Sequence, residues 1–187
     1  MVAARQCGAD PYQHAVRRGR ADLAVVLAEL GASIETDPLD EALGAIARGE
    51  EPSGRLAYGL DDDAKEVLIL AALWGSLELV LDSVGPNLSG RVGGSPSGSL
   101  LHHAAWVGNP KIVGELPSRG ADPVARSTAE YDTPFAWAAL ASQYHGLQGR
   151  DYVAVAELLA EAGNPIEARF LDVAEGPLHA WLEQRLD

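Results

Sequence analysis

A small group of histidine, tyrosine and aspartate residues has side chains suited to acid–base chemistry. Tyr131, Asp132, Tyr144 and His145 lie in one stretch of the chain, and His103 precedes them. An imidazole close to a carboxylate or a phenol could act as a general acid and base. The sequence shows no nucleophile elbow, paired-carboxylate motif or glycine-rich cofactor loop beside them. We therefore expect these residues to be polar loop residues, and we expect neither a catalytic site nor a cofactor.

Metal binding is not indicated by the histidines, the acidic residues or the cysteine. His102 and His103 are adjacent, and adjacent side chains on a helix point about 100° apart, so the two cannot chelate one ion. The histidines show no zinc-ligand spacing, and Cys7 has no second cysteine to join it. The run Asp61–Asp63 lacks the alternation and the glycine of a calcium loop. We expect these aspartates to cap a helix and to favour its dipole.

The elements that must position such side chains are indicated by a repeated pattern of small and apolar residues. Pairs of small residues are followed by two further residues and then by glycine, with Ser142 replacing the glycine in the last case. Small pairs let neighbouring helices approach closely. Each pair is followed by apolar residues four apart that lead to a glycine, which is typical of a helix and its end. The small pairs are Ala15-Val16, Ala71-Ala72, Ala104-Ala105 and Ala138-Ala139, and the apolar sets are Leu23/Leu27/Gly31, Leu77/Leu81/Gly85, Ile112/Leu116/Gly120 and Val155/Leu159/Gly163.

The stretch from Ser99 to Gly108, with His102 before the small pair, resembles the signature of the ankyrin repeat, and Gly120-Ala121-Asp122 ends the unit in the same way. We identify the chain as similar to bacterial-type members of that family. The resemblance implies an all-α, ankyrin-like helix-turn-helix solenoid of about five repeats with terminal capping helices. It also implies that His102 and His179 join adjacent loops through hydrogen bonds. The expected single array over 1–187 has units at about 10–33, 34–60, 61–90, 97–122 and 131–165, and a C-terminal cap at 166–187.

Members of the family are mostly protein-binding scaffolds, which implies a protein partner for this chain. In the family, the two positions between the small pair and the glycine face the concave groove of the inner helices. The resemblance therefore assigns an apolar, aromatic and arginine-containing surface to the groove and the loop tips. Trp137, which lies between two alanines, is expected in the core instead. The expected partner-binding residues are Arg17, Arg18, Leu73, Trp74, Trp106, Val107, Leu140, Tyr131, Tyr144 and His145.

Several segments depart from the pattern. In the second unit, Asp37-Pro38 is a good helix start, but Glu51–Gly59 carries helix breakers, so a loop or a single turn should replace the outer helix. Residues Gly85–Gly98 form a long glycine-, serine- and proline-rich loop, which is either a flexible finger or a mobile contact loop. Gln143–Arg150 is an insertion of a kind that often carries binding. Pro117 should kink or shorten its outer helix.

Composition and charge exclude some classes of partner. The net charge of −13 argues against nucleic acid, because phosphate binding needs clustered lysine and arginine. No uninterrupted apolar run reaches the length of about 18 residues that a membrane span needs, and the N-terminus lacks a secretory signal. A single cysteine allows no internal disulfide and fits a reducing compartment. We expect a cytoplasmic protein that binds neither nucleic acid nor membranes.

The function that these observations favour is protein recognition through the concave groove and the loop tips, as an adaptor, inhibitor or regulator. Two alternatives stay open. One is a repeat scaffold adapted to bind a small molecule or to catalyse a reaction, with residues 143–150 as a lid. The other is an acidic protein that binds a basic partner through its charge.

Overall fold

Several helices begin at an aspartate or threonine whose side chain caps them. The computed structural model describes residues 10–53, 56 and 59–186. The side chain of Asp37 accepts a hydrogen bond from the backbone N–H of Asp40, and Pro38 takes the first helical position. Asp61 caps the next helix in the same way, through the N–H of Ala64. These contacts satisfy backbone donors that the first turn of a helix leaves free.

The described chain is all-α apart from one short ladder, in which Ser89–Gly90 (β1) pairs antiparallel with Gly98–Ser99 (β2). This confirms the expected fold class. The chain divides into two compact units, one ending at Ser83 and the other beginning at Val84. The single array over 1–187 stays a prediction.

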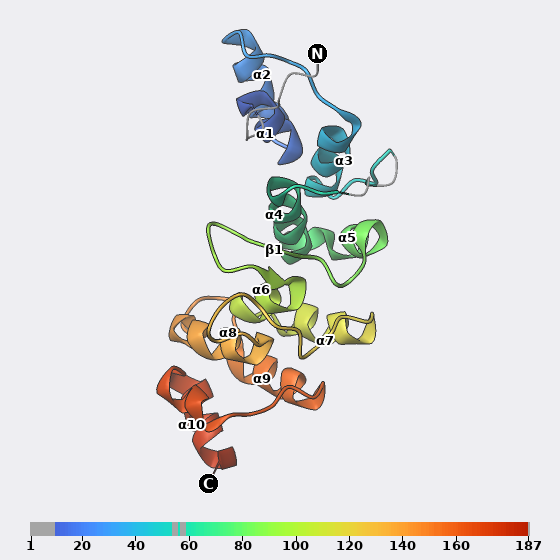
Figure 1. Ribbon diagram of the computed structural model, residues 1–187. Helices are drawn as coiled ribbons and strands as arrows, with labels where there is room; N and C mark the ends of the chain where they lie inside the picture. The colour runs from blue at the N-terminus through green and yellow to red at the C-terminus, as the bar shows by residue number, and fades with distance from the viewer. Residues whose placement is uncertain (1–9, 54–55, 57–58, 187) are drawn as a thin grey trace. The chain divides into compact units, whose positions relative to one another are not determined.

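The first unit consists of helices that pack on their sequence neighbours. α1 packs against α2 and α3, and α3 packs against α4 (Figure 1). No helix follows α3 within residues 48–53, 56 and 59–61, as the helix breakers there predict. The helices of this unit are α1 (Pro11–Arg17), α2 (Ala21–Glu29), α3 (Pro38–Ala47), α4 (Asp62–Ala71), the π-helical turn η1 (Ala72–Ser76) and α5 (Leu77–Val84).

By length and composition alone, the continuous helical stretch Asp62–Val84 could cross a membrane. The structure gives a different account of its apolar residues. Gly75 has a φ of 135°, which is outside the helical region and breaks the stretch into α4 and α5. Half of the 18-residue segment with the highest hydropathy in this stretch is buried inside the protein. The apolar residues therefore fit a kinked pair of core helices.

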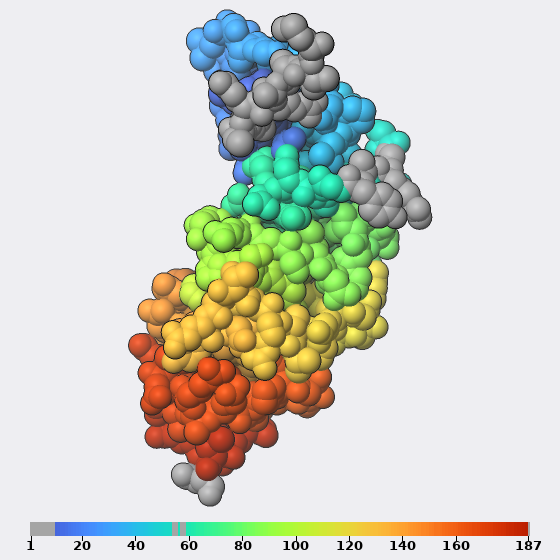
Figure 2. Space-filling model, viewed as in Figure 1, coloured from blue at the N-terminus to red at the C-terminus, as the bar shows by residue number. Residues whose placement is uncertain are grey.

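The second unit consists of two helical hairpins, α6 with α7 and α8 with α9, and of a last helix, α10, that packs on the second hairpin. α6 packs against α8, and α7 packs against α9, while α10 lies against α9. In the space-filling view, the residues of the closing segment, coloured red, lie against those of the preceding hairpin, coloured orange (Figure 2). The helices are α6 (Leu100–Trp106), α7 (Pro110–Ser118), α8 (Pro134–Ala141), η2 (Ser142–Tyr144), α9 (Tyr152–Glu161), η3 (Ala168–Asp172) and α10 (Gly176–Leu186).

Alanines, leucines and two phenylalanines contribute to the core of this unit. Ala104 and Ala105 of α6 and the alanines of α8 are fully buried, as the small pairs predict. Phe135 of α8 stacks on Phe170 of η3 with ring centroids 5.1 Å apart, so the closing segment covers an apolar face that would otherwise be exposed. The helix α7 continues through Pro117 to Ser118, where the missing N–H affects only its last turn.

Candidate functional site

An exposed aromatic pair lies at the end of α6 in the second unit. Trp106 is 38% exposed and Tyr144 of η2 is 41% exposed, and their ring centroids are 6.4 Å apart. The indole of Trp106 also packs edge-on against buried Trp137, at 6.0 Å. One side of Trp106 is therefore fixed by the core, and the other is open to a partner. We call Trp106, Tyr144 and Arg150 the aromatic cluster.

Hydrogen bonds from the insertion and from α9 hold the aromatic cluster in place. The hydroxyl of Tyr152 donates to the backbone carbonyl of Trp106 at 3.0 Å, and Arg150 Nη1 donates to that hydroxyl at 3.1 Å. The guanidinium of Arg150 also lies over the ring of Tyr144, 5.6 Å from its centroid. Burial raises the pKa of the Tyr152 hydroxyl although Arg150 acts in the opposite direction. Tyr152 thus stays protonated and remains a donor.

Two buried histidines lie beneath the aromatic cluster and contact Trp137 with their rings, at 5.2 Å for His102 and 5.1 Å for His103. His102 Nδ1 accepts from the backbone N–H of Ser99, and its Nε2 donates to the carbonyl of Asp132 at 2.8 Å. The expected role of His102 in joining adjacent loops is confirmed. His103 Nε2 donates to the carbonyl of Gly90 at 3.1 Å and so holds β1 on α6.

Both histidines are neutral in the folded protein at neutral pH. Burial lowers the pKa of His102 and of His103, even though the backbone carbonyls at their ring nitrogens favour the protonated form. Neither imidazole is presented to solvent. His103 therefore cannot serve as the base that the catalytic alternative needs. His179 was expected to resemble His102, but its side chain is 40% exposed and lies 3.7 Å from Glu183 of its own helix.

The other sequence-predicted residues of the second unit lie outside the aromatic cluster. Tyr131 is half-buried under the guanidinium of Arg169, at 5.5 Å. His145 is exposed, and its Nδ1 lies 3.0 Å from the carbonyl of Ser142. Val107 and Leu140 are half-buried. Nothing in the structure groups these four residues into one site.

Two residues of the insertion were not singled out from the sequence. Arg150 is a member of the aromatic cluster, and Leu147 is 52% exposed. Both belong to Gln143–Arg150, so the insertion itself was the signal that pointed to them.

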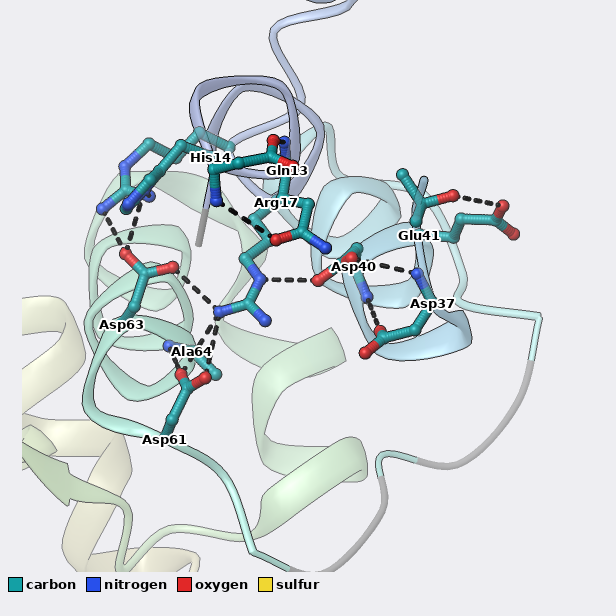
Figure 3. Close-up of polar contacts among 12 residues, drawn as sticks. Gln13, His14, Arg17, Asp37, Asp40, Glu41, Asp61, Asp63 and Ala64 are labelled. Carbon is teal, nitrogen blue, oxygen red and sulfur yellow. Dashed lines mark hydrogen bonds and ion pairs between the residues drawn. The ribbon is translucent and has the colours of Figure 1, made fainter. Parts of the chain in front are cut away.

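In the first unit, the predicted groove residues have different surroundings. Trp74 is 75% exposed, whereas Leu73 beside it is buried. Arg17 is also buried, and its side chain is only 8% exposed. Figure 3 shows its guanidinium among three aspartates, from α3 and from the start of α4. We call Arg17, Asp40, Asp61 and Asp63 the charge cluster.

The distances in the charge cluster are those of charge-assisted hydrogen bonds. Arg17 Nε donates to Asp40 at 2.6 Å, and Arg17 Nη1 donates to Asp61 at 3.1 Å and to Asp63 at 3.0 Å (Figure 3). Asp40 is fully buried and also accepts from the backbone N–H of Asp37. One guanidinium therefore connects α1 to α3 and to α4.

The charges of this cluster stabilise one another. Burial acts to lower the pKa of Arg17, but its hydrogen bonds to Asp40, Asp63 and Asp61 outweigh burial and raise it. Burial acts to raise the pKa of Asp63, but hydrogen bonds from Arg18 and Arg17 outweigh burial and lower it. Arg18 donates to Asp63 at 2.8 Å and is half-buried. The arginines serve the packing of this unit, and the Arg17 side chain is only 8% exposed.

Comparison with known proteins shows similarity in fold only. No family model matches the sequence, and no curated protein matches it. Among solved structures, the chain is similar to the human ASB11 ankyrin repeat domain, with 18% sequence identity and a TM-score of 0.49. The match covers 95% of this chain and 98% of that chain.

Proposed function

We propose that this protein is a scaffold for protein recognition and that the aromatic cluster anchors its partner. The observation that carries the proposal is that Trp106 and Tyr144 are exposed and yet held in place. Trp106 packs on buried Trp137 and its carbonyl accepts from the Tyr152 hydroxyl, while the guanidinium of Arg150 lies over the ring of Tyr144. Tryptophan, tyrosine and arginine are the residue types most often found at energetic hot spots. A side chain that is already fixed loses little conformational entropy when a partner covers it.

Other exposed residues extend the proposed surface. Leu147 lies in the same insertion as Tyr144 and Arg150 and adds apolar area. In the first unit, Trp74 is an exposed tryptophan that we propose as a separate anchor. The acidic net charge would favour a partner with basic residues around its apolar contact.

The small-molecule or catalytic alternative has less support. It requires a reactive side chain under residues 143–150 that a substrate can reach. Of the two histidines that this alternative could use, His103 is buried and bonded to the carbonyl of Gly90, and His145 has its Nδ1 3.0 Å from the carbonyl of Ser142. The pKa of His103 is lowered by burial, but an imidazole without access to solvent cannot exchange a proton with a substrate.

Substitution of the two exposed aromatic residues tests the proposal. Trp106→Ala and Tyr144→Ala should each weaken capture of the partner at least tenfold, because truncation of a hot-spot residue costs about 2 kcal/mol or more. The tagged full chain is used to capture proteins from an extract of its own cells, and the captured proteins are identified and quantified by mass spectrometry. Circular dichroism should show unchanged helicity, because both side chains are exposed at the surface.

Val124→Ala is the matched control, because Val124 is 43% exposed in the same unit and lies outside the aromatic cluster. It should retain full capture. Capture that survives both aromatic substitutions would refute the proposed site. Capture that disappears in 0.3 M salt, with or without those substitutions, would instead support recognition by charge alone.

A further inference from the structure

An apolar surface in the first unit is left open by the local fold. α2 and the segment after it expose large aliphatic side chains, which a small folded unit usually covers. Val25 is 59% exposed and Leu30 is 79% exposed, and both belong to this surface. The other exposed members are Leu23, Val26 and Ile34.

The described residues between α3 and α4 form no outer helix, and this explains the exposure. In the second unit, the outer helix α7 is covered by the outer helix of the next hairpin, α9. The contact is close, because the methyl groups of Leu158 lie 3.5 Å from the position that a Cβ on Gly114 would take. α2 has no equivalent neighbour among the residues described, since those that follow α3 are not helical.

A hollow of about 460 Å³ lies where such a neighbour would pack. Val16 of α1 and Val25 of α2 line one part of it, and Arg48, directly after α3, lines another. Ala21, Ala24 and Ala28 lie at helical spacing and, being small, leave room along α2. The hollow is thus bordered by an apolar helix face and by the end of α3, where an outer helix would begin.

The unit that carries this apolar surface is strongly acidic. The described part of the first unit has 15 Asp and Glu against 5 Lys and Arg, a net charge of −10. Each of those five bases is already paired with a carboxylate of the same unit. Glu29 lines the hollow and Glu35 follows Ile34, and neither carboxylate is matched by a base in the described part of the chain.

We propose that the hollow beside α2 receives an amphipathic helix of a partner protein, with an apolar face edged by lysine or arginine. The helix would lie against Val25 and Ala28 as α9 lies against α7, and its basic residues would meet Glu29 and Glu35. Laying an apolar helix face into a groove is a general mode of recognition, and charge complementarity at the rim selects the partner. The aromatic cluster takes no part in it, so this proposal stands or falls independently of that site.

A designed peptide tests the proposal on the full chain. The probe is a labelled 16-residue helix with leucine and alanine at helical spacing on one face and lysine on the other, and binding is measured by fluorescence anisotropy. We expect saturable binding that Val25→Asp weakens at least tenfold. Val25→Asp adds a negative charge, so purely electrostatic attraction to a basic peptide would increase instead. Val124→Asp introduces the same change at an exposed valine of the other unit and should leave binding unaffected.

Two control peptides separate the apolar from the charge contribution. A scrambled peptide of the same composition, without an apolar face, should bind at least tenfold more weakly. The amphipathic peptide with glutamate in place of lysine should also bind at least tenfold more weakly. Equal binding of either control, or no binding of the probe, would overturn the proposal.

Two further outcomes would assign the hollow to another occupant and so also overturn the proposal. Sedimentation velocity could show dimers that Val25→Asp dissociates, and the occupant would then be a second copy of this chain. Probe binding that appears only after removal of residues 1–9 would make that segment the occupant.

Discussion

At the scale of single residues, the charge cluster makes a sharp prediction for stability. Arg17→Met should lower the free energy of unfolding of the first unit by about 3–5 kcal/mol, because it leaves Asp40 buried without its counter-charge. The methionine keeps most of the apolar length of the arginine, so the loss comes from charge and hydrogen bonds. Urea denaturation followed by circular dichroism would measure it.

Arg20→Met is the matched control for Arg17→Met. Arg20 also pairs with a carboxylate, that of Asp22 at 2.8 Å, but both side chains are largely exposed. Exposed ion pairs contribute about 1 kcal/mol or less, so this variant should unfold almost as the wild type does. Similar losses for the two variants would contradict the structural role given to Arg17.

The sequence predicted the residues of the aromatic cluster better than it predicted those of the charge cluster. Trp106 and Tyr144 were expected at the surface, and both are exposed. Arg17 was expected in the groove but is buried, since its partners Asp40, Asp61 and Asp63 come from later helices. A local pattern between a small pair and a glycine carries no information on contacts so distant in the chain. The approach of Arg150 to Tyr144, within the same insertion, was not predicted either.

At the scale of helices, two glycines with opposite surroundings test how closely the elements pack. A Cβ on Gly44 of α3 would lie 2.4 Å from the backbone carbonyl oxygen of Val16, so Gly44→Ala should force α3 away from α1. We expect a loss of about 1–3 kcal/mol. A Cβ on Gly114 of α7 would lie 3.5 Å from Leu158, an ordinary contact. Gly114→Ala should therefore stabilise the protein by about 0.5–1 kcal/mol through helix propensity.

The midpoints of urea denaturation would show whether Gly44→Ala lowers the stability and whether Gly114→Ala raises it. A stabilising Gly44→Ala would show that the contact between α1 and α3 is looser than described. A destabilising Gly114→Ala would show that the space between α7 and α9 is already full.

The positions of the helices were largely predictable because their signals are local. Capping aspartates, a first-turn proline and terminal glycines marked the starts and ends, and the breakers after Gly49 predicted the missing outer helix. The ladder of β1 with β2 was not predicted. Its two-residue strands lie in the glycine- and serine-rich segment, and the carbonyl of Gly90 also accepts a hydrogen bond from His103. No alternation of apolar residues marks such short strands.

At the scale of the whole molecule, the two units contain ionisable groups with different acid sensitivity. His102 and His103 in the second unit have a pKa lowered below the ordinary value of 6.5, with burial as the largest cause. The unfolded chain therefore binds protons more readily than the folded unit, and stability is lost as the pH falls below about 6.5. Asp63 in the first unit has a pKa lowered below its ordinary value of 3.8, so its contribution is present above pH 3.8 and lost only below it.

Because the two histidines lie in the second unit and Asp63 lies in the first, acid should weaken the second unit before the first. Between pH 6.5 and pH 4.5, hydrogen exchange measured by mass spectrometry, corrected for the intrinsic effect of pH, should show growing exposure of α6 and α8. Protection of α1, α3 and α4 should persist until the pH falls below about 4, because the carboxylate of Asp63 remains ionised until then. His103 donates to β1, so the segment around Gly90 should lose protection together with α6. Simultaneous loss in both units near pH 6 would show that the buried histidines do not set the acid limit of the second unit.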